Sequence, residues 1–103
     1  MFISEKYILE SNGITTKLRN SKKFTPDLES EVMLSNNPNI FLLALGRKDC
    51  PTSTIINLMQ CPDDRVRLKI AKHPNTPKSV LQRYLNDKNQ KVVNAAKKRL
   101  KIK

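Results

Sequence analysis

The chain has 103 residues, a net charge of +11, 38% hydrophobic residues and only two cysteines. This length suits one domain with a modest core, and two cysteines cannot build the disulfide framework of a small secreted protein. Because the N-terminus carries an early acidic residue and no long apolar run, we expect a cytoplasmic protein without a signal peptide or membrane anchor.

The N-terminal third predicts two short helices. The first is expected over residues 3–11 and should end at Asn12 and Gly13, because glycine accepts the left-handed conformation that commonly closes a helix. The second is expected over residues 14–22, where apolar side chains recur at one-turn spacing.

The later helix starts carry capping residues or prolines. Thr25 before Pro26 is typical, because the hydroxyl accepts a backbone N–H and proline lacks a donor that would be unpaired at this position. By the same signals, helices should begin at Pro26, Pro38, Pro51, Asp64, Pro77 and Asn89.

A pattern of apolar residues and prolines recurs every 26 residues. The stretch from Asp64 to Asp87 aligns without gaps with the sequence on either side, and Pro77 falls on Pro51. A fixed period of this size indicates stacked units, because one helix pair cannot bury its own apolar face. The register predicts one continuous core made of Ile40, Ala44, Ile55, Met59, Val66, Ile70, Leu81, Leu85, Val92 and Ala96.

The segment from Val66 through His73-Pro74-Asn75-Thr76-Pro77 to Leu85 resembles the variant leucine-rich repeat, which is related in shape to HEAT repeats. The resemblance implies an all-α fold, a right-handed α-solenoid of stacked short helix pairs with about three and a half repeats. We expect one domain over 1–103, with degenerate repeats over 1–37, clear repeats over 38–63 and 64–89, and a closing helix over 90–103. One founding member carries an iron–sulfur cluster on an N-terminal cysteine group, which this chain lacks. The family fixes no activity.

Positive charge is concentrated in the C-terminal part. Residues 63–103 hold thirteen basic and three acidic residues, whereas residues 1–62 hold seven and six. In a stack, residues one period apart lie on neighbouring helices whose axes are about 8–10 Å apart. This places Arg65 beside Lys91, Lys72 beside Lys98, and His73 between Arg47 and Arg99.

These seven residues form the predicted binding surface for a polyanion. We expect the backbone of DNA or RNA, bound with little sequence specificity, because phosphate contacts position a protein without reading bases. Two alternatives remain open at this stage, an acidic protein bound by an adaptor or inhibitor, and a face that only keeps the protein soluble.

The sequence predicts no enzyme. It contains no readable Ser/His/Asp or Cys/His set, and the spacing of Cys50 and Cys61 fits no ordinary zinc site. His73, the only histidine, lies in an inter-helix turn, and we expect it to have a structural rather than a catalytic role. We expect Tyr84 in the core rather than on the surface as a platform for stacking bases. We therefore expect no catalytic residue, cofactor, metal or small-molecule substrate.

Overall fold

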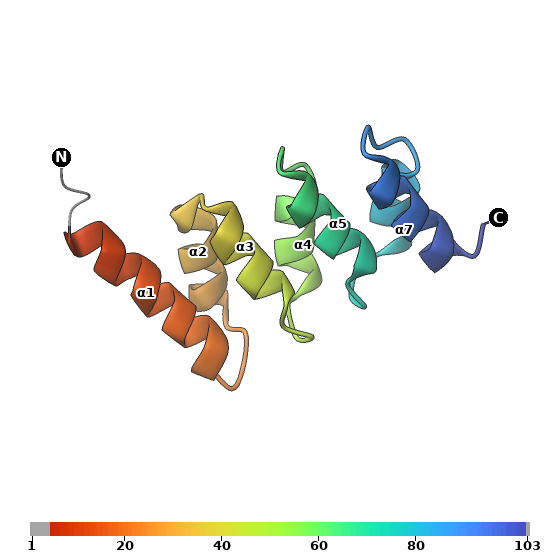
Figure 1. Cartoon of the computed structure of the whole chain (residues 1–103). Coiled ribbons are helices and arrows are strands. Elements are labelled where there is room, and N and C mark those ends of the chain that lie inside the picture. Colours follow the sequence, from red (N-terminus) through yellow and green to blue (C-terminus); the bar gives the residue numbers. More distant parts are fainter. Residues whose placement is uncertain (1–4, 103) are drawn as a thin grey trace.

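A computed structural model describes the backbone of residues 5–102 and the side chains of residues 13–102. This part of the chain is all-helical, as expected, and contains no strand (Figure 1). Its helices are α1 (Glu5–Asn20), α2 (Pro26–Ser35), α3 (Pro38–Leu45), α4 (Thr52–Leu58), α5 (Asp64–Lys72), α6 (Lys78–Tyr84) and α7 (Gln90–Leu100). Even α1, with 16 residues, is too short and too polar to span a bilayer, and no other described helix meets that requirement.

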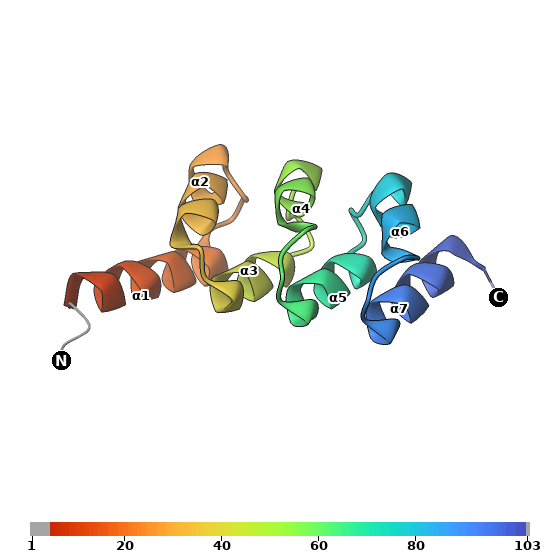
Figure 2. The ribbon, with the colours of Figure 1, turned by 90° about the horizontal axis from the view of Figure 1, so that it is seen from above.

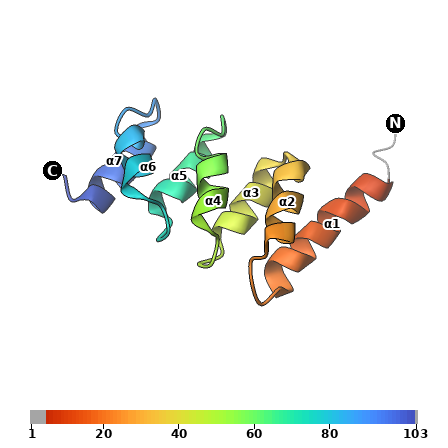
Figure 3. The same cartoon turned by 180° about the vertical axis from the view of Figure 1, so that it is seen from behind.

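The helices form two rows. Seen from above, α1, α3, α5 and α7 lie side by side in one row, and α2, α4 and α6 lie in the other (Figure 2). The second row faces the viewer when the molecule is seen from behind (Figure 3). Within the first row α5 packs between α3 and α7, and the molecule measures 49 × 34 × 16 Å. Each row therefore leaves one long side open to solvent.

The six helix starts predicted from Pro26 onward are confirmed to within one residue. The Thr25 hydroxyl accepts a hydrogen bond from the backbone N–H of Leu28 at 3.1 Å, which caps α2. Pro51 and Pro77 immediately precede α4 and α6. The side chains of Asn37, Asp63 and Asn89 cap α3, α5 and α7 in the same way.

The predicted break at Asn12 and Gly13 is wrong. Helix α1 runs through both residues, and Gly13 does not adopt a positive φ. An interior glycine costs about 1 kcal/mol relative to alanine. Packing of α1 on α2 and α3, which buries Leu18 to 4% exposure, offsets that cost. Residues 3 and 4, where the first helix was expected to begin, lie outside the described residues.

The predicted apolar core is confirmed as one cluster. All ten expected positions belong to it or pack against it, and only Leu85 among them is half-buried rather than buried. Tyr84 also lies inside, and its hydroxyl donates to the carbonyl of Met59 at 2.8 Å. The hydroxyl is thus satisfied within the fold, and the ring takes a core position.

Candidate polyanion-binding interface

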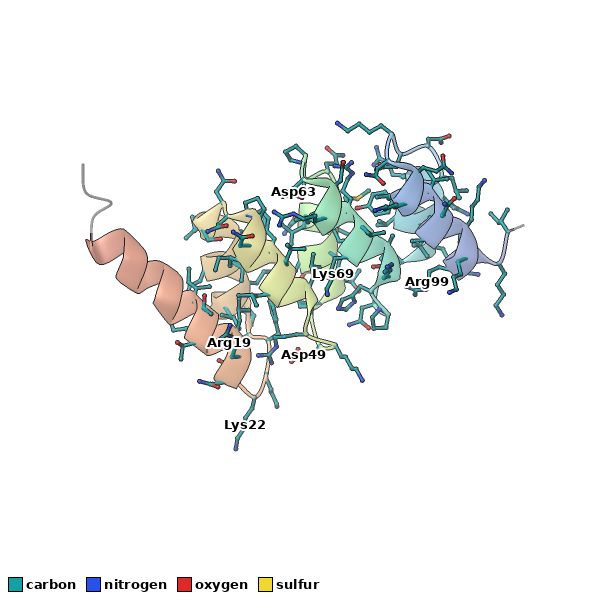
Figure 4. All side chains as sticks on the ribbon, in the orientation of Figure 1. Arg19, Lys22, Asp49, Asp63, Lys69 and Arg99 are labelled. Atoms are coloured by element: carbon teal, nitrogen blue, oxygen red, sulfur yellow. The ribbon has the colours of Figure 1, made fainter. Side chains whose placement is uncertain are left out.

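Helix α5 separates its apolar and basic side chains onto opposite sides. Val66 and Ile70 are fully buried, whereas Arg65, Lys69 and Lys72 are exposed. The spacing of i, i+4 and i+7 brings the three cations onto one side of the helix, since 3.6 residues complete a turn. Figure 4 shows Lys69 midway along α5, on the row that faces the viewer.

Helix α7 repeats this arrangement next to α5. Val92 and Ala96 are buried, while Lys91 and Lys98, seven residues apart, are exposed on the opposite side. Because α7 packs directly against α5, the outer sides of the two helices adjoin. We call the surface made of Arg65, Lys69, Lys72, Lys91 and Lys98 the basic face.

The nearby carboxylates pair with arginines rather than with the lysines of the basic face. Asp63 contacts Arg65 at 2.8 Å, and this hydrogen bond lowers the pKa of the Asp63 carboxyl. Asp64 and Asp87 both contact Arg67. Within the described residues, the four lysines of the basic face contact no carboxylate, so their charges are balanced only by solvent ions.

Arg67 is basic but lies inside the fold. Its side chain is 7% exposed, its Nε donates to Asp87 Oδ2 at 2.8 Å, and its Nη1 donates to the carbonyl of Cys61 at 2.7 Å. The hydrogen bond to Asp87 outweighs burial and raises the pKa of the guanidinium. Arg67 therefore joins the start of α5 to the connection between α6 and α7, and it is not available to a partner.

Arg47, His73 and Arg99 form a line, as the 26-residue register predicts, but their side chains bind backbone carbonyls. Arg47 Nη1 donates to the carbonyl of Leu18 at 2.9 Å, His73 Nε2 to that of Arg47 at 2.8 Å, and Arg99 Nη1 to that of His73 at 2.6 Å. Each acceptor lies in the last turn of the preceding helix of the row or just beyond it. We call these three residues the carbonyl ladder.

His73 was expected at the margin of the binding surface, but its side chain is buried. It is only 4% exposed, and its Nδ1 accepts the backbone N–H of Asn75 at 3.0 Å. Since Nδ1 is an acceptor, Nε2 carries the proton and the ring is neutral. His73 thus has a structural role and does not add charge to the basic face.

Arg47 is also occupied by partners of its own chain. Its side chain is 14% exposed and pairs with Asp49 at 2.8 Å, and its guanidinium lies 5.8 Å from the centre of the Phe24 ring. The hydrogen bond from Arg47 lowers the pKa of the Asp49 carboxyl. Of the seven predicted contact residues, four lie on the basic face, namely Arg65, Lys72, Lys91 and Lys98.

Lys69 belongs to the basic face but was not among the predicted residues. Comparing residues 26 positions apart does not reveal Lys69 as part of a basic cluster, because the residues 26 positions before and after it are Leu43 and Ala95. Helical spacing provides the signal instead, since Lys69 stands four residues after Arg65 and three before Lys72.

Within the described residues, no group of three His, Cys, Asp or Glu side chains is placed to hold a metal ion. The two thiols are free, and burial raises the pKa of Cys50 to about 12, which makes that thiol a poor nucleophile at neutral pH. No family model, curated protein or solved structure matches the chain.

Proposed function

We propose that the protein is a non-enzymatic, cytoplasmic module that binds the phosphate backbone of DNA or RNA through the basic face. The observation that carries this proposal is the set of four exposed lysines on two adjacent helices without a carboxylate neighbour among the described residues. Like charges on neighbouring helices repel, and screening over about 8–10 Å relieves this only in part. A polyanion converts the repulsion into attraction and releases counterions.

Binding of this kind carries little sequence preference. Tyr84 and Phe41 are buried, and the half-buried Phe24 lies against Arg47, so these three aromatic rings are not free to stack on bases. Contacts from lysine to phosphate fix the position of a nucleic acid without reading its bases. No metal, cofactor or small-molecule substrate enters the proposal.

We further propose that the two rows are a right-handed solenoid of 26-residue units of the variant leucine-rich or HEAT-like kind. Hydrogen bonds across one period support it. Asn89 donates to Asp64 and Tyr84 to Met59, residues 25 positions apart, and His73 donates to Arg47 at a separation of 26. Stacked units would present the basic face as a continuous surface.

Affinity for a random-sequence DNA duplex, measured by fluorescence anisotropy over a salt series, tests the proposal. Each phosphate neutralised on a duplex contributes about 0.9 to the slope of log affinity against log salt. The double variant Lys72→Ala and Lys98→Ala should weaken binding equally on every sequence and flatten the slope by up to about two units. Its matched control is Lys78→Ala with Arg83→Ala on α6, which removes the same charge from the other row.

If the control double variant weakens binding as much as the basic-face variant, net charge alone explains the affinity and the basic face is not the site. If the wild type fails to bind duplex even at low salt, the nucleic-acid proposal is refuted. An acidic protein surface is then the second candidate. The half-buried Leu42 and Leu43 on α3, next to the cations of α5, favour that candidate because they offer apolar contact beside the charge.

A further inference from the structure

A cavity of about 210 Å³ lies between the C-terminal ends of α3 and α5. It shares Lys69 and Lys72 with the basic face and has a third lysine, Lys48, which is also exposed. Its volume is far more than one water molecule requires. The remaining lining residues are Leu45, Gly46, Arg47, His73 and Pro74.

A glycine at position 46 leaves room for the cavity. Gly46 stands 26 residues before Lys72 and 52 before Lys98, so glycine occupies the position where α5 and α7 carry lysines. With no side chain at this position, α3 leaves open the space that a lysine would fill. The backbone of Gly46 has a φ of −71°, which any residue adopts, so conformation alone does not require glycine there.

The walls of the cavity are held by hydrogen bonds. The Asn75 side-chain amide donates to the carbonyls of Lys48 and Cys50, each at 2.9 Å, and His73 donates to the carbonyl of Arg47. The loop that carries Lys48 is therefore fixed against the turn after α5. The backbone that carries Lys48 therefore loses little entropy on binding, although the lysine side chains still have to be ordered.

The charge of the cavity favours an anion. Arg47 is already paired with Asp49, but Lys48, Lys69 and Lys72 contact no carboxylate within the described residues. The C-terminus of each helix carries about half a negative charge, so the two termini offset roughly one of the three lysine charges. About two positive charges remain around one small cavity.

We propose that this cavity holds one phosphate group of the bound nucleic-acid backbone, with Lys48, Lys69 and Lys72 as its ligands. This inference rests on the nucleic-acid function proposed above. A tetrahedral phosphate accepts hydrogen bonds from several directions, and lysines from two segments, the loop after α3 and helix α5, can supply them. The cavity then anchors the backbone at one point, and the rest of the basic face follows it along α5 and α7.

The variant Gly46→Lys distinguishes binding of a phosphate inside the cavity from a general effect of positive charge on affinity. If only charge matters, an added lysine strengthens duplex binding. If a phosphate enters the cavity, the new side chain blocks it, and we expect weaker binding with a salt slope lower by about 0.9. The matched control is Asn39→Lys, which adds the same charge to the same side of α3, seven residues earlier and outside the cavity, and should bind at least as tightly as the wild type.

Two further variants guard against a folding artefact. A Cβ at Gly46 would lie 3.3 Å from the carbonyl oxygen of Leu43, so Gly46→Ala measures the cost of the backbone contact without filling the cavity. If Gly46→Lys lowers the melting temperature, Lys48→Ala replaces it, since this exposed lysine can be removed without a packing change. Lys48→Ala should weaken duplex binding and lower the salt slope by up to about 0.9, since Lys69 and Lys72 still face the phosphate, and Lys78→Ala on α6 should do neither.

Inorganic phosphate, titrated against chloride at constant ionic strength and followed by amide chemical shifts, tests the cavity without nucleic acid. Saturable shifts at Gly46 and Lys48 in the wild type, lost in Gly46→Lys, support the site. Duplex binding that is unchanged or tighter in Gly46→Lys overturns the inference and leaves the proposed function standing. Phosphate shifts without any duplex binding keep the phosphate site and refute the nucleic-acid function, and the absence of both overturns both.

Discussion

Removing the carboxylate of Asp87 should be the most destabilising single change to a charged group. Asp87 is 8% exposed and binds Arg67, whose own side chain is 7% exposed. Truncation of one partner leaves a buried charge without compensation, which costs about 3–5 kcal/mol. We expect about 3 kcal/mol for Asp87→Ala, at the low end, because Asp64 and the carbonyl of Cys61 still contact the guanidinium.

A loss of this size is large for a domain with a total stability of about 5–15 kcal/mol. At about 4–8 °C per kcal/mol for a chain of this length, it lowers the melting temperature by roughly 12–24 °C. Urea unfolding followed by circular dichroism at 25 °C gives the free energy directly, provided that the dependence on urea stays the same in all variants.

A double-mutant cycle with Arg67→Met identifies the cause. One period earlier the corresponding positions hold Phe41 and Cys61, so an uncharged pair suits this place in the fold. The double variant should therefore lose at least about 1.5 kcal/mol less than the sum of the two single losses. Additive losses, or an Asp87→Ala variant within about 0.5 kcal/mol of the wild type, would refute the reasoning.

Three more outcomes follow from burial and charge. Leu81→Ala should cost about 2–5 kcal/mol, whereas Leu34→Ala, at a side chain 84% exposed, should stay within about 0.5 kcal/mol; equal losses in urea unfolding would contradict the core. A thiol reagent should modify Cys61 in the native protein and Cys50 only after unfolding, and two fast thiols would contradict the burial. Because arginine or asparagine partners lower the pKa of three carboxyls, the stability that these groups contribute is present above about pH 4 and is lost as the pH falls through their folded pKa values. Urea midpoints unchanged from pH 6 to 2 would contradict this expectation for Asp49, Asp63 and Asp64.

Helix starts were predictable from sequence because their signals are local. A capping side chain such as that of Thr25 or Asp63 satisfies an N–H only two or three residues away, so no distant contact decides the outcome. The core was predictable for a related reason. Apolar residues recur every 26 positions in the sequence, and the residues selected by that spacing belong to the core cluster or pack against it.

The end of a helix at glycine was not predictable in the same way. The Asn12-Gly13 pair carries the local signal for a helix end, yet α1 continues because its later turns pack on α2 and α3. Tertiary packing outweighs a local preference of about 1 kcal/mol. The sequence of α1 alone does not show which helices will pack against it.

For Arg47, His73 and Arg99 the sequence predicted which residues are neighbours but not what their side chains bind. The 26-residue spacing placed Arg47, His73 and Arg99 next to one another, as their hydrogen bonds show. It relates one side chain to another, however, and says nothing about contacts between a side chain and the backbone. The partners of these three side chains are backbone carbonyls at helix ends, which every sequence contains and no sequence pattern marks. The cavity at Gly46 also escaped the comparison, since it arises from a missing side chain rather than from a shared one.

The carbonyl ladder limits how far one part of the chain can influence another. Its bonds always reach back to the preceding helix of the row, and no side-chain hydrogen bond in the described part of the chain joins residues more than 29 apart. Opening at one end therefore breaks only the bonds to its neighbour, and cooperativity passes from helix to helix rather than through the whole molecule at once. His73 donates to Arg47 and accepts from Arg99, so α5 is tied on both sides and should exchange its amide hydrogens most slowly. The helix that carries Lys69 and Lys72 is thus the one least free to unfold locally.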